Sequence, residues 1–239
     1  MKKNTFLLLF VILALYTRAQ DYSGDQLLDK AIEYHDPTGA WPSFRGVLSI
    51  TMQSPGKSDR VSEVVIDLPA RYFKLSATTD DITTTQIIDR GQCTLSLNGN
   101  ADFSEDDAKS HGLNCDRARS IKNYYTYLYG LPMKLRDPGT IIDPIVHKKT
   151  FEEKEYLVLK VTYDKTVGGD TWYFYFDPAT YAMEVYQFYH NEASNDGEYI
   201  LLSGEERVSG IKMPKTRAWY YNSDDKYLGT DVLIKASGL

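Results

Sequence analysis

Hydrophobic and polar residues alternate along most of the chain, with the two-residue period of β-strands. In the segment 44–53 one side of this alternation carries Leu48 and Ile50, and the other side is polar. The links between such segments are short and contain Gly, Asn or Asp, as hairpin turns do. The pattern predicts a mainly β (α+β) fold, an antiparallel meander of about eleven strands. The predicted strands are 44–53, 61–67, 71–77, 83–89, 93–97, 156–163, 171–176, 182–190, 199–208, 212–221 and 227–235.

Two segments have a helical period instead. Ser23 and Gln26 have the spacing of a capping box, in which each side chain bonds the other residue's backbone at a helix start. The second helix follows a cap at Asn114 and runs to Tyr129, with Gly130 as its C-terminal stop. The sequence therefore predicts two principal helices, one before the strands and one in the middle of the chain.

The segment 130–147 contains three prolines and is predicted to be an ordered crossing loop. Beyond it the strand pattern resumes. The chain has no internal repeat, low-complexity tract or flexible linker, so residues 20–239 are predicted to form a single domain.

The N-terminus has the pattern of a secretory signal peptide. Lys2 and Lys3 precede an unbroken apolar run, residues 6–16, which is too short for a stable membrane anchor. Cleavage is expected after Ala19, which makes residues 1–19 the signal peptide. No cysteine at this junction offers a lipoprotein anchor. The mature chain is therefore expected to be soluble and periplasmic or secreted.

Charge and composition narrow the possible partners. The formal net charge is −6, and it becomes −9 without the signal peptide, which carries three basic residues and no acid. An acidic chain without a basic run is a poor candidate for binding nucleic acid or anionic lipid headgroups. A hydrophobic content of 42% excludes disorder, and 19 tyrosines are the one unusual feature.

The two cysteines, Cys93 and Cys115, are a candidate disulfide, because an exported protein folds under oxidising conditions. The alternative is two small buried thiols, since sequence alone does not give their separation in space. No histidine lies at ligand spacing from either cysteine, and no metal site is predicted.

Catalytic motifs are absent from the sequence. It contains no G-x-S-x-G elbow, no phosphate-binding glycine loop and no H-E-x-x-H helix. Glu205 and Glu206 lie in one strand and point to opposite faces, so they cannot act together as acid and base. We therefore predict a protein that is not an enzyme and has no cofactor. A hydrolase remains an alternative that would need two carboxylates to converge in a cleft.

The stretch TWYFYFDPATYAMEVYQFYH has aromatic residues on both faces of its two strands. Trp172, Phe174 and Phe176 share one face, and Tyr173 and Tyr175 share the other. A sheet with two apolar faces must have both covered or must enclose something. A concave sheet with helices over its mouth would leave an apolar cavity. The alternative is that helices and loops fill this space. We expect the tryptophan-containing face to point inward.

The predicted ligand is therefore hydrophobic, and its affinity would come from burying methylenes, at roughly 0.8 kcal/mol each. The residues expected to line the cavity are apolar side chains of the predicted strands and of the second helix. They are Leu48, Ile50, Tyr125, Leu128, Leu159, Trp172, Phe174, Phe176, Met183 and Val185.

Four motifs resemble the LolA/LolB-like superfamily of periplasmic lipoprotein carriers. They are DLPARYFKL (67–75), YFDPATYAMEVYQFYH (175–190), GEERVSGIKMPKTRAWYY (204–221) and YYTYLYGLPMKLRDPG (124–139), the last resembling LolA-like proteins of unknown function. The resemblance implies an incomplete antiparallel β-barrel whose concave face is covered by helices and holds lipid or lipoprotein acyl chains. It also implies that the protein works in a Gram-negative cell envelope. Arg71 matches the family arginine that helps to hold the helical lid. The alternative function is a non-catalytic structural or interaction module of the cell envelope with a filled core.

Overall fold

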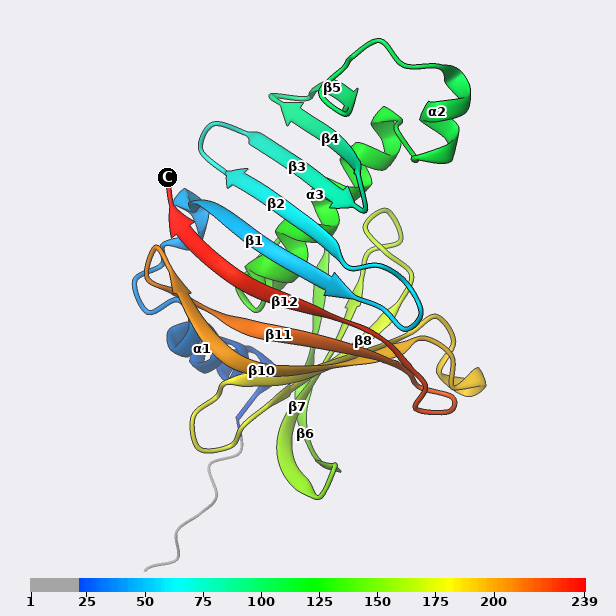
Figure 1. Cartoon of the computed structure of the whole chain (residues 1–239). Coiled ribbons are helices and arrows are strands. Elements are labelled where there is room, and N and C mark those ends of the chain that lie inside the picture. The colour runs from blue at the N-terminus through cyan, green and yellow to red at the C-terminus, as the bar shows by residue number, and fades with distance from the viewer. Residues whose placement is uncertain (1–21) are drawn as a thin grey trace, which may run out of the picture.

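The strands form one antiparallel sheet with two unpaired ends (Figure 1). The computed structural model describes residues 22–239, so the predicted signal peptide and its cleavage site lie outside the described part. The strand order is β5-β4-β3-β2-β1-β12-β11-β10-β9-β8-β7-β6. The strands are β1 (Arg45–Gln53), β2 (Arg60–Asp67), β3 (Tyr72–Thr79), β4 (Ile82–Asp89), β5 (Gln92–Leu97), β6 (Thr140–Phe151), β7 (Lys154–Tyr163), β8 (Thr171–Phe176), β9 (Met183–Tyr189), β10 (Glu198–Val208), β11 (Ile211–Tyr221) and β12 (Tyr227–Gly238). The sheet is a half-barrel, which confirms the predicted fold class.

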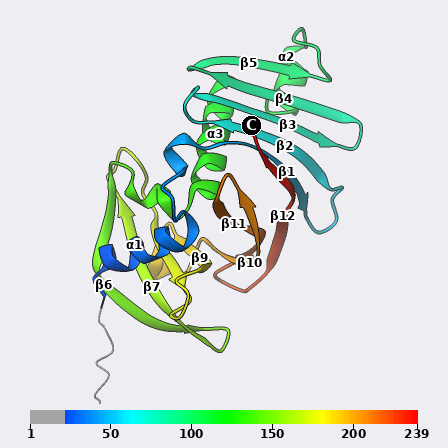
Figure 2. The same ribbon diagram turned by 90° about the vertical axis from the view of Figure 1, so that its left-hand side faces the viewer.

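The helices begin where their caps predict. Ser23 and Gln26 form the capping box of α1 (Gly24–His35), with both reciprocal hydrogen bonds present. The Asn114 side chain accepts a hydrogen bond from the backbone N–H of Arg117 and caps α3 (Cys115–Gly130). A short helix that the sequence pattern did not show, α2 (Glu105–Ser110), lies between β5 and α3. Figure 2 shows α3 inside the curve of the sheet, so it covers the concave face.

Strand β6 corrects the prediction of a crossing loop over residues 130–147. Its pairing with β7 is interrupted between Ile142 and Val146, and Pro144 lies in the interruption. A proline has no backbone N–H to donate, and within sheets it is confined to edge strands and irregular positions. The interruption shifts the alternation of apolar and polar side chains. The sequence pattern therefore does not reveal this strand. The sheet therefore has twelve strands within the described residues, rather than about eleven.

The two aromatic faces of β8 pack into two separate clusters. Phe174 and Phe176 lie in the main core on the concave side, and Trp172 packs against that core. Tyr173 and Tyr175 lie in a second cluster on the opposite side of the sheet. The expectation that the tryptophan-containing face points inward is confirmed.

The outer cluster is shielded by the tyrosine hydroxyls of its own side chains, which form hydrogen bonds, and by long side chains of neighbouring residues. The ammonium of Lys149 lies 4.0 Å from the ring centre of Tyr173, a cation–π distance. The hydroxyl of Tyr173 donates to Glu192, and that of Tyr175 donates to the Oε1 of Gln187 at 2.8 Å. The second aromatic face is therefore buried without a partner protein.

Helix α1 is held against the sheet by a buried histidine at its end. The ring Nδ1 of His35 lies 2.9 Å from the carbonyl oxygen of Lys212, and its Nε2 accepts the backbone N–H of Met183 at 3.0 Å. Since Nε2 accepts, Nδ1 carries the proton and the ring is neutral. Burial lowers the pKa of His35, because the charged ring would lose hydration.

We expect His35 to make the stability of the fold depend on pH. Its pKa is lower in the folded state than the unfolded value of about 6.5. The unfolded chain therefore binds more protons near that pH, and the stabilisation is complete above about 6.5 and lost as the pH falls below it. Replacing His35 by Asn should cost about 1–3 kcal/mol at pH 7.5 through unsatisfied backbone groups, and less at pH 5.

Urea unfolding of the wild type and H35N at both pH values measures this difference. H190N is the control variant, because His190 is exposed and its pKa is raised, through its pairing with Asp170, rather than lowered. A cost of H35N that is equal at pH 5 and pH 7.5 would contradict the assignment.

Candidate functional site

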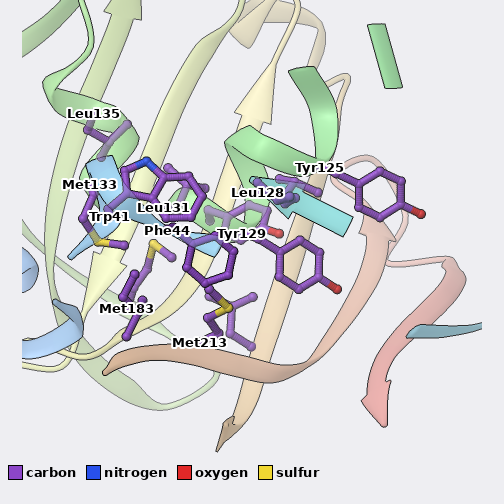
Figure 3. Close-up of a cluster of buried hydrophobic side chains, with 14 of the residues drawn as sticks. Trp41, Phe44, Tyr125, Leu128, Tyr129, Leu131, Met133, Leu135, Met183 and Met213 are labelled. Atoms are coloured by element: carbon purple, nitrogen blue, oxygen red, sulfur yellow. The ribbon is translucent and has the colours of Figure 1, made fainter. Parts of the chain in front are cut away.

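The residues predicted to bind a ligand gather on the concave face, which α1 and α3 both cover. Tyr125 and Leu128 project from the helix onto the concave face, as Figure 3 shows among their neighbours. Nine of the ten predicted residues belong to this one cluster: Leu48, Ile50, Tyr125, Leu128, Leu159, Trp172, Phe174, Phe176 and Met183. All of them except Trp172 are at most 4% exposed. Side chains therefore fill the concave face in this state of the protein.

Val185 is the exception and requires a correction. It packs with Tyr173 and Tyr175 in the outer cluster, not on the concave face. The pairing of β8 with β9 shifts between Tyr175 and Phe176, so that Phe176 lies opposite Met183. The irregularity places Met183 and Val185 on different faces, although they are two residues apart. An uninterrupted alternation had placed them on the same face.

Four residues of this cluster come from segments where neither a strand nor a helix was predicted: Trp41, Leu131, Met133 and Leu135. Trp41 stacks on Phe44 with ring centres 5.2 Å apart, and both face the end of α3. A Cβ atom on Gly130 would lie 2.3 Å from the Trp41 ring, so only glycine allows this close approach. Gly130 was predicted as a helix stop, but its contact with Trp41 depends on the tertiary structure.

A buried arginine lies beneath the helix. The guanidinium of Arg217 is 4.0 Å from the ring centre of Tyr129, and it donates to the carbonyl oxygens of Pro214 and Leu128 at 3.2 and 3.5 Å. Arg217 is 1% exposed. It therefore contacts both the ring and the backbone of α3 from below.

Polar atoms without partners surround this arginine. Asp231, on the neighbouring strand β12, is directly opposite Arg217 in the pairing and is 3% exposed. Burial raises the pKa of Asp231, and the positive charge of Arg217 acts in the other direction. Within residues 22–239, no hydrogen-bond partner is present for the hydroxyls of Tyr129 and Tyr186, Nε of Arg217 or Oδ1 of Asp231. The contact between α3 and the sheet therefore leaves these four buried polar atoms without hydrogen bonds.

Arg71 occupies a different place from the one its motif implied. It is exposed in the turn between β2 and β3, with a left-handed φ of 54°. In the described chain no hydrogen bond or ion pair joins its side chain to α3, so Arg217 is the arginine that contacts the helix.

An open cleft of about 510 Å³ lies beside α3, where the helix faces the β7–β8 turn. Its aromatic lining includes Tyr127, Tyr163 and Trp172. The Trp172 ring stacks on Phe188 at 4.8 Å and on Phe174 at 5.9 Å between centres. Trp172 therefore connects the open cleft to the buried cluster. Burial raises the pKa of Tyr163 to about 12, so its hydroxyl stays neutral at physiological pH.

A second cleft, of about 500 Å³, lies between the end of α1 and strands β9–β11. Glu184 and Glu205 both line it. Glu184 pairs with Lys154 at 2.7 Å, and Glu205 accepts the hydroxyl proton of Tyr34 at 3.0 Å and pairs with Arg207 at 3.2 Å. Both carboxylates therefore already have partners, and the geometry does not present a free acid and base.

Cys93 and Cys115 form a disulfide, with Cα atoms 5.8 Å apart. Cys93 lies in the edge strand β5, and Cys115 is the first residue of α3. The bond therefore ties the N-terminal end of α3 to the edge of the sheet.

Residues 22–239 contain no group of three or more His, Cys, Asp or Glu side chains arranged to hold a metal ion. None of their helices combines the length and apolar character needed to cross a membrane.

Comparisons with known proteins agree on the fold. The model of a family described as "Family of unknown function (DUF6503)" matches residues 2–236. A LolA superfamily protein from Nitrosomonas europaea is 10% identical with a TM-score of 0.52, over 90% of this chain and 92% of that one. A domain described as outer membrane lipoprotein-sorting, from Vibrio parahaemolyticus, is 11% identical with a TM-score of 0.51, over 89% and 92%.

A DUF1329 family protein from Desulfovibrio piger is 9% identical with a TM-score of 0.50, over 91% of this chain and 93% of that one. No curated protein matches the chain. At these identities the structures show the fold alone, and this protein has a LolA-like fold, as its motifs predicted.

Proposed function

The chain belongs to the DUF6503 family of unknown function, and we propose that it binds a hydrophobic ligand between α3 and the concave face. The ligand is a lipid or the acyl chain of a lipoprotein. The observation that carries the proposal is an apolar concave cluster covered by α1 and α3, with an aromatic cleft open beside α3 at Trp172. The cleft volume of about 510 Å³ falls in the range of roughly 300–1,000 Å³ typical of small-molecule sites.

In this proposal, the energy gained by burying a ligand is comparable to the cost of moving α3 off the concave face. Each buried polar atom without a partner costs about 1–3 kcal/mol, and four such atoms lie on Tyr129, Tyr186, Arg217 and Asp231. Displacing the helix would expose these atoms to water. An acyl chain that buries ten methylenes contributes about 8 kcal/mol, which offsets much of the lost packing. In this proposal the ligand replaces the apolar side chains of α3 on the concave face.

The comparisons support this proposal by analogy of fold. The neighbour from Nitrosomonas europaea is a LolA superfamily protein, and the domain from Vibrio parahaemolyticus is described as lipoprotein-sorting. We propose the same exported setting here, with residues 1–19 removed and the mature chain in the periplasm or outside the cell. The proposed activity is binding, without catalysis.

Replacing Trp172 by Ala should weaken binding of a fluorescent fatty acid about tenfold, which corresponds to about 1.4 kcal/mol. The reason is that Trp172 links the open cleft to the buried cluster. Fluorescence titration of the wild type and W172A measures the effect. Y221A is the control, because Tyr221 is 40% exposed and is not among the residues that line the cleft.

Native mass spectrometry of protein purified from its own periplasm is the second measurement. We expect a lipid to be retained in the native spectrum and released by solvent extraction. If no lipid is retained and no fatty acid binds the wild type, the binding proposal must be abandoned.

The filled concave cluster favours the second candidate, a non-catalytic structural or interaction module. Hydrogen exchange separates the two candidates, because a covering helix that moves exchanges its amides more readily than the central strands do. For a ligand-binding protein, the amides of residues 118–130 should exchange by local opening and become protected when a fatty acid is added. For a module with a fixed core, they should exchange only through global unfolding.

A further inference from the structure

A third cleft lies between the first half of α3 and strands β2–β4, and its volume is about 370 Å³. Apolar walls come from Leu75 on the sheet and Ile121 on the helix. Arg60, from β2, and Arg117, from the first turn of α3, also line this cleft. The cleft thus combines an apolar surface with two positive charges.

Neither arginine forms an ion pair within residues 22–239, and Nε of Arg60 is buried without a hydrogen-bond partner. The charge of Arg60 also acts on the buried carboxyl of Asp231. Several other arginines of the chain do pair with acids. They are Arg45, Arg90, Arg119, Arg136 and Arg207. Two unpaired guanidinium groups at one cleft are therefore a local feature that needs an explanation.

A buried amide in the same cleft supplies an independent observation. Gln86, on β4, is 4% exposed, and its Oε1 has no hydrogen-bond partner. Buried side-chain amides are nearly always hydrogen-bonded, so an unpartnered one indicates a missing partner. The oxygen and nitrogen of an amide exchange places by a half-turn of the group, which allows Gln86 to donate to an acceptor.

We propose that this cleft binds the anionic group of a ligand, a phosphate or carboxylate, between Arg60 and Arg117, with Gln86 as a hydrogen-bond donor. Guanidinium groups are suited to this role because their planar donors match both anions. The apolar walls take an attached alkyl chain, so the ligand is an amphiphile. This part of the inference rests on the proposed function.

The charge of the whole chain does not oppose this assignment. The net charge of −6 argues against a broad anionic surface as partner. Binding of a ligand inside a cleft depends instead on the charges of the residues that line the cleft. One carboxylate, Asp80, also lines the cleft and forms no ion pair with either arginine in the described chain. The two arginines and Asp80 together leave one net positive charge. A single anionic group completes this site.

Calorimetric titration with three probes tests the inference: decyl phosphate below its critical micelle concentration, decanol and inorganic phosphate. The wild type should bind decyl phosphate at least tenfold more tightly than decanol. R117Q should abolish most of this preference, and Arg117 is exposed, so the variant is expected to fold. R119Q is the matched control, because it removes the same charge from the same helix at a residue that pairs with Asp116.

The outcomes separate this inference from the proposed function. Equal binding of decyl phosphate and decanol, unchanged in R117Q, would overturn the anion site and leave hydrophobic binding in place. Binding of inorganic phosphate that depends on Arg117, without binding of decanol, would support the anion site with a free anion as its source and contradict the hydrophobic ligand. Failure of all three probes to bind would overturn both.

Discussion

Replacing Arg217 by Met should lower the free energy of unfolding by about 3 kcal/mol, because buried groups that contact this cation would lose their partner. Arg217 is 1% exposed and lies opposite Asp231, which is 3% exposed. Without Arg217, the buried carboxyl of Asp231 keeps only the charge of Arg60 to offset its burial. The variant also loses the contacts of Arg217 with Tyr129 and with the carbonyl oxygen of Leu128. The covering helix should loosen as a result.

A double-mutant cycle identifies the cause of the loss. R217M with D231N should be more stable than R217M alone, because the second change removes the uncompensated carboxyl. R207M is the control, since Arg207 is exposed and its surface ion pair contributes about 0–1 kcal/mol. Urea unfolding at pH 7.5 gives the four free energies of the cycle, for the wild type, R217M, D231N and R217M/D231N, and a fifth for R207M. A loss below 1 kcal/mol in R217M would show that the buried pair does not stabilise the contact between α3 and the sheet.

Reduction of the disulfide should lower the free energy of unfolding by about 3 kcal/mol. Cys93 and Cys115 are separated by 22 residues, and closing a loop of this length restricts the unfolded chain by about that amount. The bond also joins the start of α3 to β5, so its loss should increase hydrogen exchange in the first turns of the helix. The double variant C93S/C115S should reproduce both effects.

Urea unfolding with and without dithiothreitol measures the change, and thiol titration verifies the reduction. C93S/C115S is the internal control, because reductant should not alter its unfolding further. If the fully reduced wild type unfolds at the same urea concentration as the oxidised protein, the bond contributes no net stability.

Local patterns were sufficient to predict most of the fold. Alternation located eleven of the twelve strands, and the caps at Ser23 and Asn114 placed the two principal helices. Both signals depend on near neighbours in sequence. The failures occurred where the regular period is interrupted, at Pro144 in β6 and at the irregularity that places Val185 on the outer face. The position of such an interruption depends on how the strand pairs with its neighbour. The sequence of one segment does not show that pairing.

The candidate site was predictable for its apolar part and not for its polar part. The alternation of side chains between the two faces of each strand placed Leu159 and Phe174 on the concave face, where they are fully buried. The same rule treats a charged residue on a strand as exposed, and it therefore missed Arg217 and Asp231. Their burial results from α3 crossing above neighbouring strands. A short motif pointed to Arg71 instead, because motif similarity carries no information about which arginine lies beneath the helix.

The two unpaired ends of the sheet have a consequence for association between copies of the chain. An edge strand offers backbone N–H and C=O groups to any other extended chain, which promotes aggregation. Strand β5 has only six residues, and β6 is interrupted around Pro144 and presents an exposed lysine at Lys148. Short, interrupted or charged edges are poor templates for strand addition. The sheet can therefore stay open at both ends without recruiting further chains into fibres.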